Sequence, residues 1–208
     1  MVNKFNNMDI KKVLQLIESF YFRNLITKSN PNKFEMFFAE LAYGISKGTI
    51  SNIDLVLKNI DENIIEDELF IQYFKNYVPK NRDISKHILR EINDFYESEI
   101  QAICDNSSLN LEHIMPQNPR KKDWAMCSDE ENYKLHINMI GNLTLLGEEY
   151  NKSISNKPFD EKKATYLNSK INITNKIAKW DDWTFETIHE RQEELCKDAL
   201  KRWPKLSF

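Results

Sequence analysis

Two short stretches in the second half of the chain decide its fold. The first, LNLEHIMP at residues 109–116, alternates in hydropathy with a period near two, as a strand does. The second, MIGNLTLL at residues 139–146, has the character of a strand as well. Residues 151–159, NKSISNKPF, then lead into a helix that begins near Pro158. Strand, long loop, strand and helix together predict a ββα unit.

On both sides of this unit the sequence indicates helices. Apolar residues recur at three- and four-residue steps, and capping residues, proline or glycine bound several of the segments. These segments cover residues 10–21, 34–45, 53–60, 69–77 and 84–100, and a last one runs from a Thr184 cap to Trp203. We therefore expect a mainly α (α+β) protein: a helical bundle suited to docking over residues 1–105, then the ββα unit with C-terminal helices over residues 106–208.

Composition places the chain among ordinary globular proteins. Hydrophobic residues make up 41% and charged residues 29%. No apolar run is long enough for a membrane span, and the first residues lack the apolar stretch of a signal peptide. The three cysteines lie far apart and form no CxxC pair. We expect a cytoplasmic protein whose thiols are reduced.

Charge is unevenly distributed around a net value of −3. Residues 51–100 hold eleven acidic and six basic side chains, whereas residues 150–179 hold seven lysines and two acidic side chains. A polyanion would be attracted to the second region, whose balance is +5, and repelled by the first, whose balance is −5. A merely solvated lysine-rich helix face remains the plainer interpretation unless a motif beside it points to a polyanion.

Such a motif lies on the two strands. Glu112 and His113 are adjacent on the first strand, Asn142 lies on the second, and Asn151 opens the segment that enters the helix. Hydrolysis of a phosphodiester needs a base, for which an imidazole that titrates near neutrality is suited. It also uses a divalent cation, and a carboxylate with an amide oxygen suits Mg²⁺ or Mn²⁺. Each residue alone is weak evidence, because isolated Glu-His pairs are usually structural.

The order of the motifs carries more weight. LEHIMPQ at residues 111–117, IGNLTLL at 140–146, Asn151 and SNKPF at 155–159 resemble the C-terminal domain of GmrSD-type restriction endonucleases. That family, also called domain of unknown function 1524, belongs to the HNH/His-Me finger nucleases, and the same order resembles the HNH domain of RNA-guided CRISPR nucleases. A terminal pattern similar to the family's comprises Trp180, Ile188, Arg191, Leu195 and Trp203.

The resemblance implies a metal-dependent DNA endonuclease of a restriction or antiviral defence system. His113 would be the general base, and Glu112 with Asn151 would hold one Mg²⁺ or Mn²⁺ ion per site. Asn142 would bridge the two strands and hold the His113 loop, a supporting catalytic role. The nucleic-acid-binding residues would be Lys152, Lys157 and Lys162.

Three departures qualify this interpretation. Asn151 stands where many HNH enzymes have histidine, which leaves Asn156 as a rival metal ligand. No cysteine quartet is present to hold a structural zinc. The family's nucleotide-binding partner domain would precede residue 1, so we expect a fragment or a separate nuclease subunit with such a partner upstream. Since one metal cuts one strand, double-strand cleavage would need a homodimer or two nicks.

Other hypotheses remain open. The chain could be a non-catalytic helical interaction module whose HNH-like half is structural, or an RNA-directed HNH nuclease with the same chemistry. A zinc site built from Cys104, Cys127, His113 and His136 is weaker, because these spacings match no common zinc site.

Overall fold

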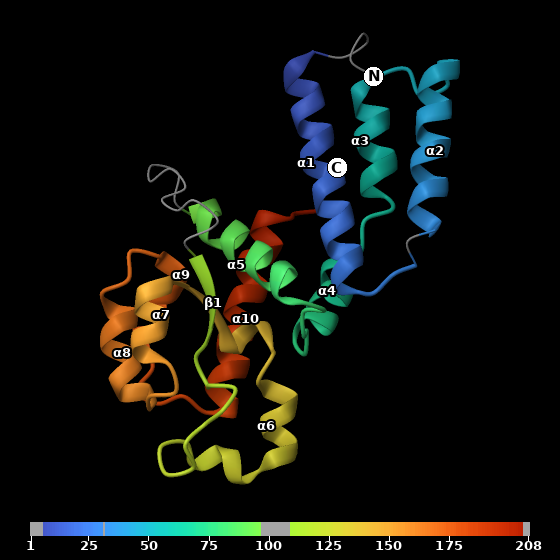
Figure 1. The fold of residues 1–208 in the computed structure, drawn as a ribbon. Coiled ribbons are helices and arrows are strands. Elements are labelled where there is room, and N and C mark those ends of the chain that lie inside the picture. The colour runs from blue at the N-terminus through green and yellow to red at the C-terminus, as the bar shows by residue number, and fades with distance from the viewer. Residues whose placement is uncertain (1–5, 31, 97–108, 206–208) are drawn as a thin grey trace. The chain divides into compact units, whose positions relative to one another are not determined.

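The computed structural model describes residues 6–30, 32–96 and 109–205 (Figure 1). The chain divides into two compact units, residues 1–74 with 199–208 and residues 75–198, which are called here the first and the second unit. Most described residues are helical, in agreement with the expected mainly α class. The domain boundary expected between residues 105 and 106 lies outside the described residues.

The first unit is built from helices at the start of the chain. They are α1 (Asn7–Ile26), α2 (Asn32–Lys47), α3 (Ile53–Asp61) and α4 (Asp67–Phe74). Side-chain caps set two of the starts, since Asn6 Oδ1 accepts from the Asp9 amide and Asn52 Oδ1 from that of Leu55. Gly48, with φ 80°, follows the end of α2 in the left-handed region that favours glycine.

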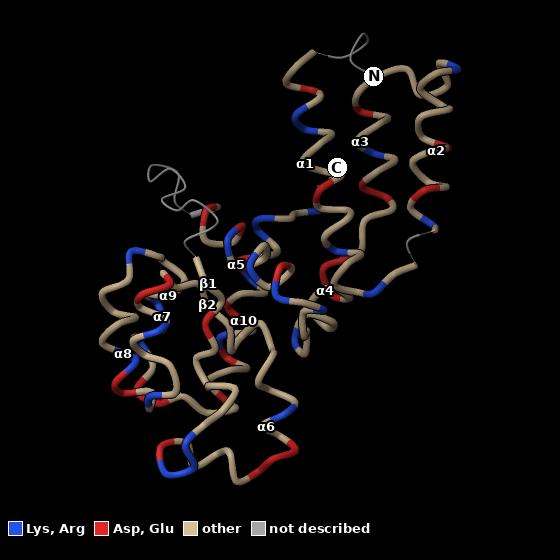
Figure 2. The backbone as a smooth tube through the Cα atoms, in the orientation of Figure 1, with Lys and Arg blue, Asp and Glu red and all other residues tan. Residues whose placement is uncertain are grey.

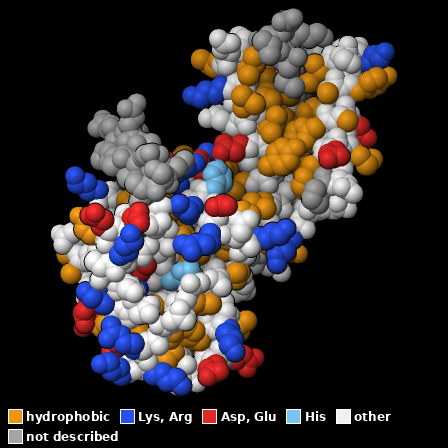
Figure 3. All heavy atoms as spheres, viewed as in Figure 1, with side chains coloured by type: hydrophobic (Ala, Val, Ile, Leu, Met, Phe, Trp, Pro, Cys, Tyr) orange, Lys and Arg blue, Asp and Glu red, His pale blue; other side chains and the backbone are white. Residues whose placement is uncertain are grey.

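Apolar residues from three of these helices form the core of the first unit. Buried members include Val13 and Phe20 of α1, Leu41 of α2 and Ile60 of α3. Figure 3 shows hydrophobic side chains at the surface over these helices too. Exposed examples are Leu14, Tyr21, Met36 and Tyr43. The described residues include no helix that is both long and apolar enough to cross a membrane.

The second unit holds the strands. Its elements are α5 (Arg82–Tyr96), β1 (Leu109–His113), the 3-10 helix η1 (Ala125–Ser128), α6 (Glu130–His136), the 3-10 helix η2 (Ile140–Asn142), β2 (Leu143–Gly147), α7 (Glu148–Ile154), α8 (Phe159–Leu167), α9 (Asn172–Asn175), the 3-10 helix η3 (Lys176–Lys179) and most of α10 (Phe185–Arg202). Figure 2 shows lysines along α7 and α8, where the sequence is most basic. A core cluster that includes Ile114, Trp124, Tyr166 and Trp183 lies between these elements.

β1 and β2 pair antiparallel, with Glu112 opposite Thr144 and His113 opposite Leu143. Both strands are shorter or shifted relative to the sequence expectation. The first ends at His113, and residues 140–142 form the turn of η2 before the second begins. Gly141 explains this turn, because a Cβ there would collide with the backbone oxygen of Ile188 on α10. The close approach of α10 therefore bends the chain where the apolar pattern alone indicates a strand.

The largest difference from expectation lies between β2 and the predicted helix. α8 begins after Pro158 as predicted, but α7 precedes it and includes Asn151. Ser155, with φ 36°, ends α7 and lets the chain turn into α8. Asn151 is thus fixed on a helix and does not lie on an irregular connection.

Candidate active site

An open cavity of about 400 Å³ lies in the second unit and collects most of the residues singled out from the sequence. The residues that line it come from the start of α5, from β1 and the turn after it, and from α7 and its end. They are Arg82, Asn110, Leu111, Glu112, His113, Pro116, Gln117, Asn118, Glu148, Asn151, Lys152, Ser155 and Asn156. Glu112, His113 and Asn151 therefore share one cavity.

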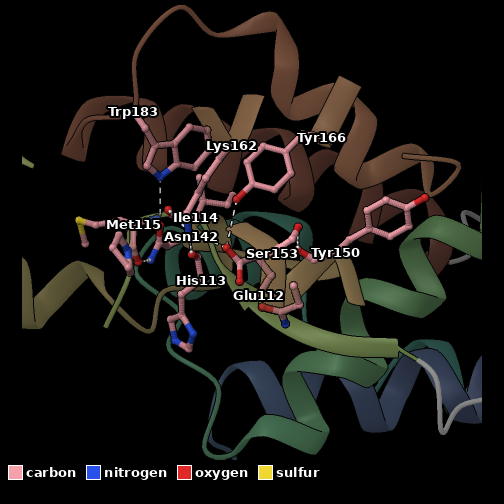
Figure 4. Close-up of polar contacts among 12 residues, drawn as sticks. Glu112, His113, Ile114, Met115, Asn142, Tyr150, Ser153, Lys162, Tyr166 and Trp183 are labelled. Atoms are coloured by element: carbon pink, nitrogen blue, oxygen red, sulfur yellow. Dashed lines mark hydrogen bonds and ion pairs between the residues drawn. The ribbon is translucent and has the colours of Figure 1, made fainter. Parts of the chain in front are cut away.

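Glu112 is buried, with 5% of its surface exposed, although it also lines this cavity. Figure 4 shows Lys162 and Tyr166, both from α8, converging on its carboxylate. Lys162 Nζ donates to Oε1 at 2.6 Å, and the Tyr166 hydroxyl donates to the same oxygen at 3.2 Å. α8 thereby fixes the orientation of the carboxylate.

Lys162 also holds the backbone that follows Glu112. Its Nζ donates to the carbonyl oxygens of His113 at 2.9 Å and Ile114 at 3.1 Å, and the residue is 0% exposed. Burial raises the pKa of Glu112 and lowers that of Lys162, and the attraction between the two charges opposes both shifts. Each group therefore supports the charged form of the other.

His113 is the titratable group best suited to accept a proton here. Its Nε2 lies 3.1 Å from Asn138 Oδ1. Burial lowers its pKa below 6.5, and the positive charges of Arg82 and Lys162 lower it further, while the hydrogen bond with Asn138 raises it. The imidazole is therefore mostly neutral at pH 7 and keeps a nitrogen lone pair free to act as a base.

Asn142 holds the turn that follows His113. It is 0% exposed, and its Oδ1 accepts from the amide of Met115 at 2.8 Å and from Trp183 Nε1 at 3.0 Å (Figure 4). Its Nδ2 donates to the carbonyls of Met115 at 3.0 Å and Ile137 at 2.9 Å. All four hydrogen bonds of the amide are used for structure.

The other residues expected at the site lie in different surroundings. Asn151 Nδ2 donates to the carbonyl of Leu111 on β1 at 3.4 Å, so α7 faces β1 at this point. Asn156 lines the same cavity, so it remains the predicted alternative to Asn151 as a metal ligand. Lys152 is exposed and paired with Glu148.

Two further lysines were expected to contact a phosphate backbone. Lys157 is partly exposed, and its Nζ lies 3.9 Å from Glu161 Oε2. Lys162 does not fit that expectation, because its ammonium is buried and donates to three protein oxygens. The family resemblance implies a contact between Lys162 and the phosphate backbone, and a lysine within a basic stretch is normally solvated.

Several residues that shape the site were not recognised from the sequence. Tyr166 and Trp183 look like ordinary core aromatics, and only their polar atoms reach the site. Lys162 and Tyr166 are four residues apart and so lie on one face of the helix. This spacing was the feature of the sequence that could have indicated that both side chains approach the same group. Asn138 and Arg82 belong to segments that carry no motif, so their approach to His113 follows only from the fold.

A comparison with known protein families identifies the family of the chain. Residues 63–198 match the family model described as GmrSD restriction endonucleases, C-terminal domain. The chain belongs to this family. The matched residues of the GmrSD C-terminal domain include the entire second unit, and with it the cavity. A restriction-endonuclease family indicates a nuclease domain with a DNA substrate. No curated protein matches the chain.

The alternative zinc site finds no support among the described residues. Cys127 is buried in the apolar core, and His136 Nε2 lies 2.8 Å from His189 Nε2. Cys104 lies outside the described residues. Within the described parts of this GmrSD C-terminal domain, no three His, Cys, Asp or Glu side chains are grouped to hold a metal.

Proposed function

We propose that this chain is an HNH-type, metal-dependent endonuclease that hydrolyses DNA phosphodiester bonds. The observation that supports this most is the shared cavity of Glu112, His113 and Asn151, in which His113 has a lowered pKa. In this proposal the two antiparallel strands and the helix α7 that follows them form the ββα-metal unit. Membership of a restriction-endonuclease family supports a role in a restriction or antiviral defence system.

His113 is the general base in this proposal. Nε2–H donates a hydrogen bond to Asn138 Oδ1 in this proposal, so Nδ1 keeps its lone pair and takes a proton from the attacking water. Asn142 holds Met115 and Ile137, and Lys162 holds the carbonyl of His113 itself. The imidazole is therefore presented from the end of β1, next to a turn that Asn142 and Lys162 hold in place.

The donor set of the cavity fits a hard divalent cation. Glu112 offers a carboxylate and Asn151 an amide oxygen, the ligand types that Mg²⁺ and Mn²⁺ prefer. We assign Glu112 and Asn151 as the residues that hold one such ion, with Asn156 as the rival to Asn151. The ion would stabilise the negative charge of the phosphate and of the leaving oxygen. Lys152 and Lys157 remain the proposed lysine contacts to the DNA backbone.

The test is cleavage of plasmid DNA by the purified chain with Mg²⁺, Mn²⁺ or EDTA. We expect cleavage that requires the metal and that falls at least about a hundredfold in His113→Ala. His87→Ala is the matched control, since His87 is an exposed histidine of α5 that does not line the cavity. Equal activity of wild type and His113→Ala would overturn the proposal and favour a non-catalytic interaction module.

An RNA substrate assayed in parallel distinguishes the second candidate activity. Faster His113-dependent cleavage of RNA than of DNA would assign the same site to an RNA-directed nuclease. The family's name and its restriction systems favour DNA. We also propose, from the family resemblance, that a nucleotide-binding domain or subunit regulates this nuclease in the cytoplasm.

A further inference from the structure

The charges around the cavity are not all neutralised. Among the charged residues that line it, Glu112 is paired with Lys162, and Glu148 is paired with Lys152. Arg82 lines the same cavity, yet its guanidinium has no ion pair or hydrogen bond within the described parts of the chain. Among the described cations that line the cavity, Arg82 is therefore the one without an acidic partner, and its guanidinium is available to an anionic ligand.

The position of Arg82 is fixed by the fold. It is the first residue of α5, whose start is capped by Asn81 Oδ1, which accepts from the Ile84 amide. Ile88 and Ile92 of the same helix are buried in the second unit, and α5 packs against β1 and β2 (Figure 1). The backbone that carries Arg82 is thus held beside the strand that carries His113. The charge of Arg82 also acts on His113, whose pKa it helps to lower.

Helix stability does not explain an arginine at this position. The N-terminal end of a helix carries a partial positive charge, so a cation in the first turn is disfavoured. Asp83 follows Arg82 but forms no ion pair with it. A residue that opposes local stability and faces a cavity is more readily explained by a ligand than by folding.

We propose that Arg82 is a phosphate-binding residue of this cavity and holds nonbridging oxygens of a nucleic-acid phosphate beside His113. A guanidinium presents paired N–H donors that match phosphate oxygens, which a lysine ammonium cannot reproduce. The inference rests on the proposed nuclease function of the same cavity. It also changes which cationic side chains are expected to contact phosphate, since Lys162 is buried and Lys152 already has an acidic partner.

The experiment compares Arg82→Gln, Arg82→Lys and Lys80→Gln, each made in the His113→Ala background. Lys80 is the matched control, an exposed cation two residues away that does not line the cavity. Binding of a short fluorescein-labelled DNA duplex is followed by anisotropy in EDTA over a range of salt concentrations. Melting temperatures are recorded for every variant, and single-turnover cleavage is measured with the same substitutions in the otherwise wild-type chain.

We expect Arg82→Gln to weaken binding about tenfold at low salt, the size of one charged hydrogen-bonded contact. It should also reduce the slope of log K against log salt by about 0.9, the value for one phosphate contact. Arg82→Lys should keep the slope but bind more weakly, and Arg82→Gln should not lower the melting temperature. Lys80→Gln should leave cleavage and affinity close to those of wild type.

The outcomes separate this inference from the proposed function. If the wild-type chain cleaves DNA through His113 but Arg82→Gln binds and cleaves as before, the role of Arg82 is wrong and the nuclease stands. Equal losses in Arg82→Gln and Lys80→Gln would indicate a diffuse positive field and would also overturn it. A wild-type chain that neither binds nor cleaves nucleic acid would refute both.

Discussion

Asn142 makes no contact through which it could touch a substrate, yet the geometry of the site depends on it. All four of its hydrogen bonds go to the protein, and three of their partners are the backbone of Met115 and Ile137. The fourth partner, Trp183, brings the segment before α10 to the same side chain. The turn after His113 and the start of β2 are thereby joined through one amide.

Replacing Asn142 with alanine should lower both stability and activity. The substitution leaves buried donors and acceptors without partners, each at a cost of about 1–3 kcal/mol. We expect a fall of several kcal/mol in the free energy of unfolding, measured with urea, and a loss of cleavage even at temperatures where the variant is folded. Asn168→Ala is the control, because Asn168 is an exposed asparagine at the end of α8 whose side chain donates to the Ala164 carbonyl of that helix. A stable variant that cuts like wild type would contradict this role.

Asn138 offers a test of the general base through pH. The base acts in its unprotonated form, so the rate is lost as pH falls through the pKa of His113, which burial sets below 6.5. In Asn138→Asp a carboxylate would face Nε2 and stabilise the imidazolium, which raises that pKa. The acidic limb of the kcat/KM profile should therefore move to higher pH. In the exposed control Asn168→Asp the acidic limb should not move. If it also stays in place in Asn138→Asp, Asn138 does not influence the base.

For single residues, the sequence identifies those that belong to a motif but not the side chains that hold the motif residues in place. Glu112, His113 and Asn151 could be placed together because their order along the chain is characteristic. Lys162 was placed wrongly, since sequence reveals a charge but not its burial. Asn138 contacts His113 from 25 residues away across a connection with no pattern, and such a contact depends on the whole fold.

The elements around the site differ in how well their patterns define them. α8 begins after Pro158, where proline can open a helix without losing a hydrogen bond, and it was predicted correctly. α7 was missed because its seven residues, EEYNKSI, bury only Ile154 and so lack an apolar face. Residues 140–142 form a turn in place of the predicted strand because Gly141 packs against α10. Short elements held by tertiary contacts are thus the ones that local periodicity misses.

The link between α8 and β1 can be measured by a double-mutant cycle. Lys162→Met removes the buried ammonium and leaves Glu112 without its counter-charge, which should cost about 3–5 kcal/mol of stability. Glu112→Gln should also destabilise, because it leaves the ammonium unpaired. The double variant should lose much less than the sum of the two single losses, since no isolated charge then remains in the interior.

A neighbouring lysine supplies the control for this cycle. Lys163 pairs with Asp181 near the surface, so Lys163→Met should change the free energy of unfolding by less than about 1 kcal/mol. Urea unfolding followed by fluorescence measures all of these variants. Strict additivity of Lys162→Met and Glu112→Gln would show that the two side chains do not support each other. The double variant should remain inactive, because it lacks the carboxylate proposed to bind the metal.

For the whole molecule, the net charge and the single proposed site limit how tightly the isolated chain can bind DNA and how many strands it can cut at once. The net charge is −3, and the lysine-rich stretch of +5 lies within an acidic protein. Affinity for a polyanion must therefore come from a small local region and should decline steeply with salt. The Glu112–His113–Asn151 cavity is a single proposed site that acts on one phosphodiester at a time.

We therefore expect the isolated chain to nick DNA weakly and without strong sequence preference. Supercoiled plasmid should become open-circular first, and linear product should follow only from later nicks. The rate should be highest in Mn²⁺ at low salt and should fall by orders of magnitude between about 50 and 200 mM salt if several phosphates are contacted. Gel analysis over time, with His113→Ala as the blank, measures both features. Efficient linearisation at one sequence in physiological salt would mean that specificity and paired cutting reside within these 208 residues, and that no regulatory partner is required.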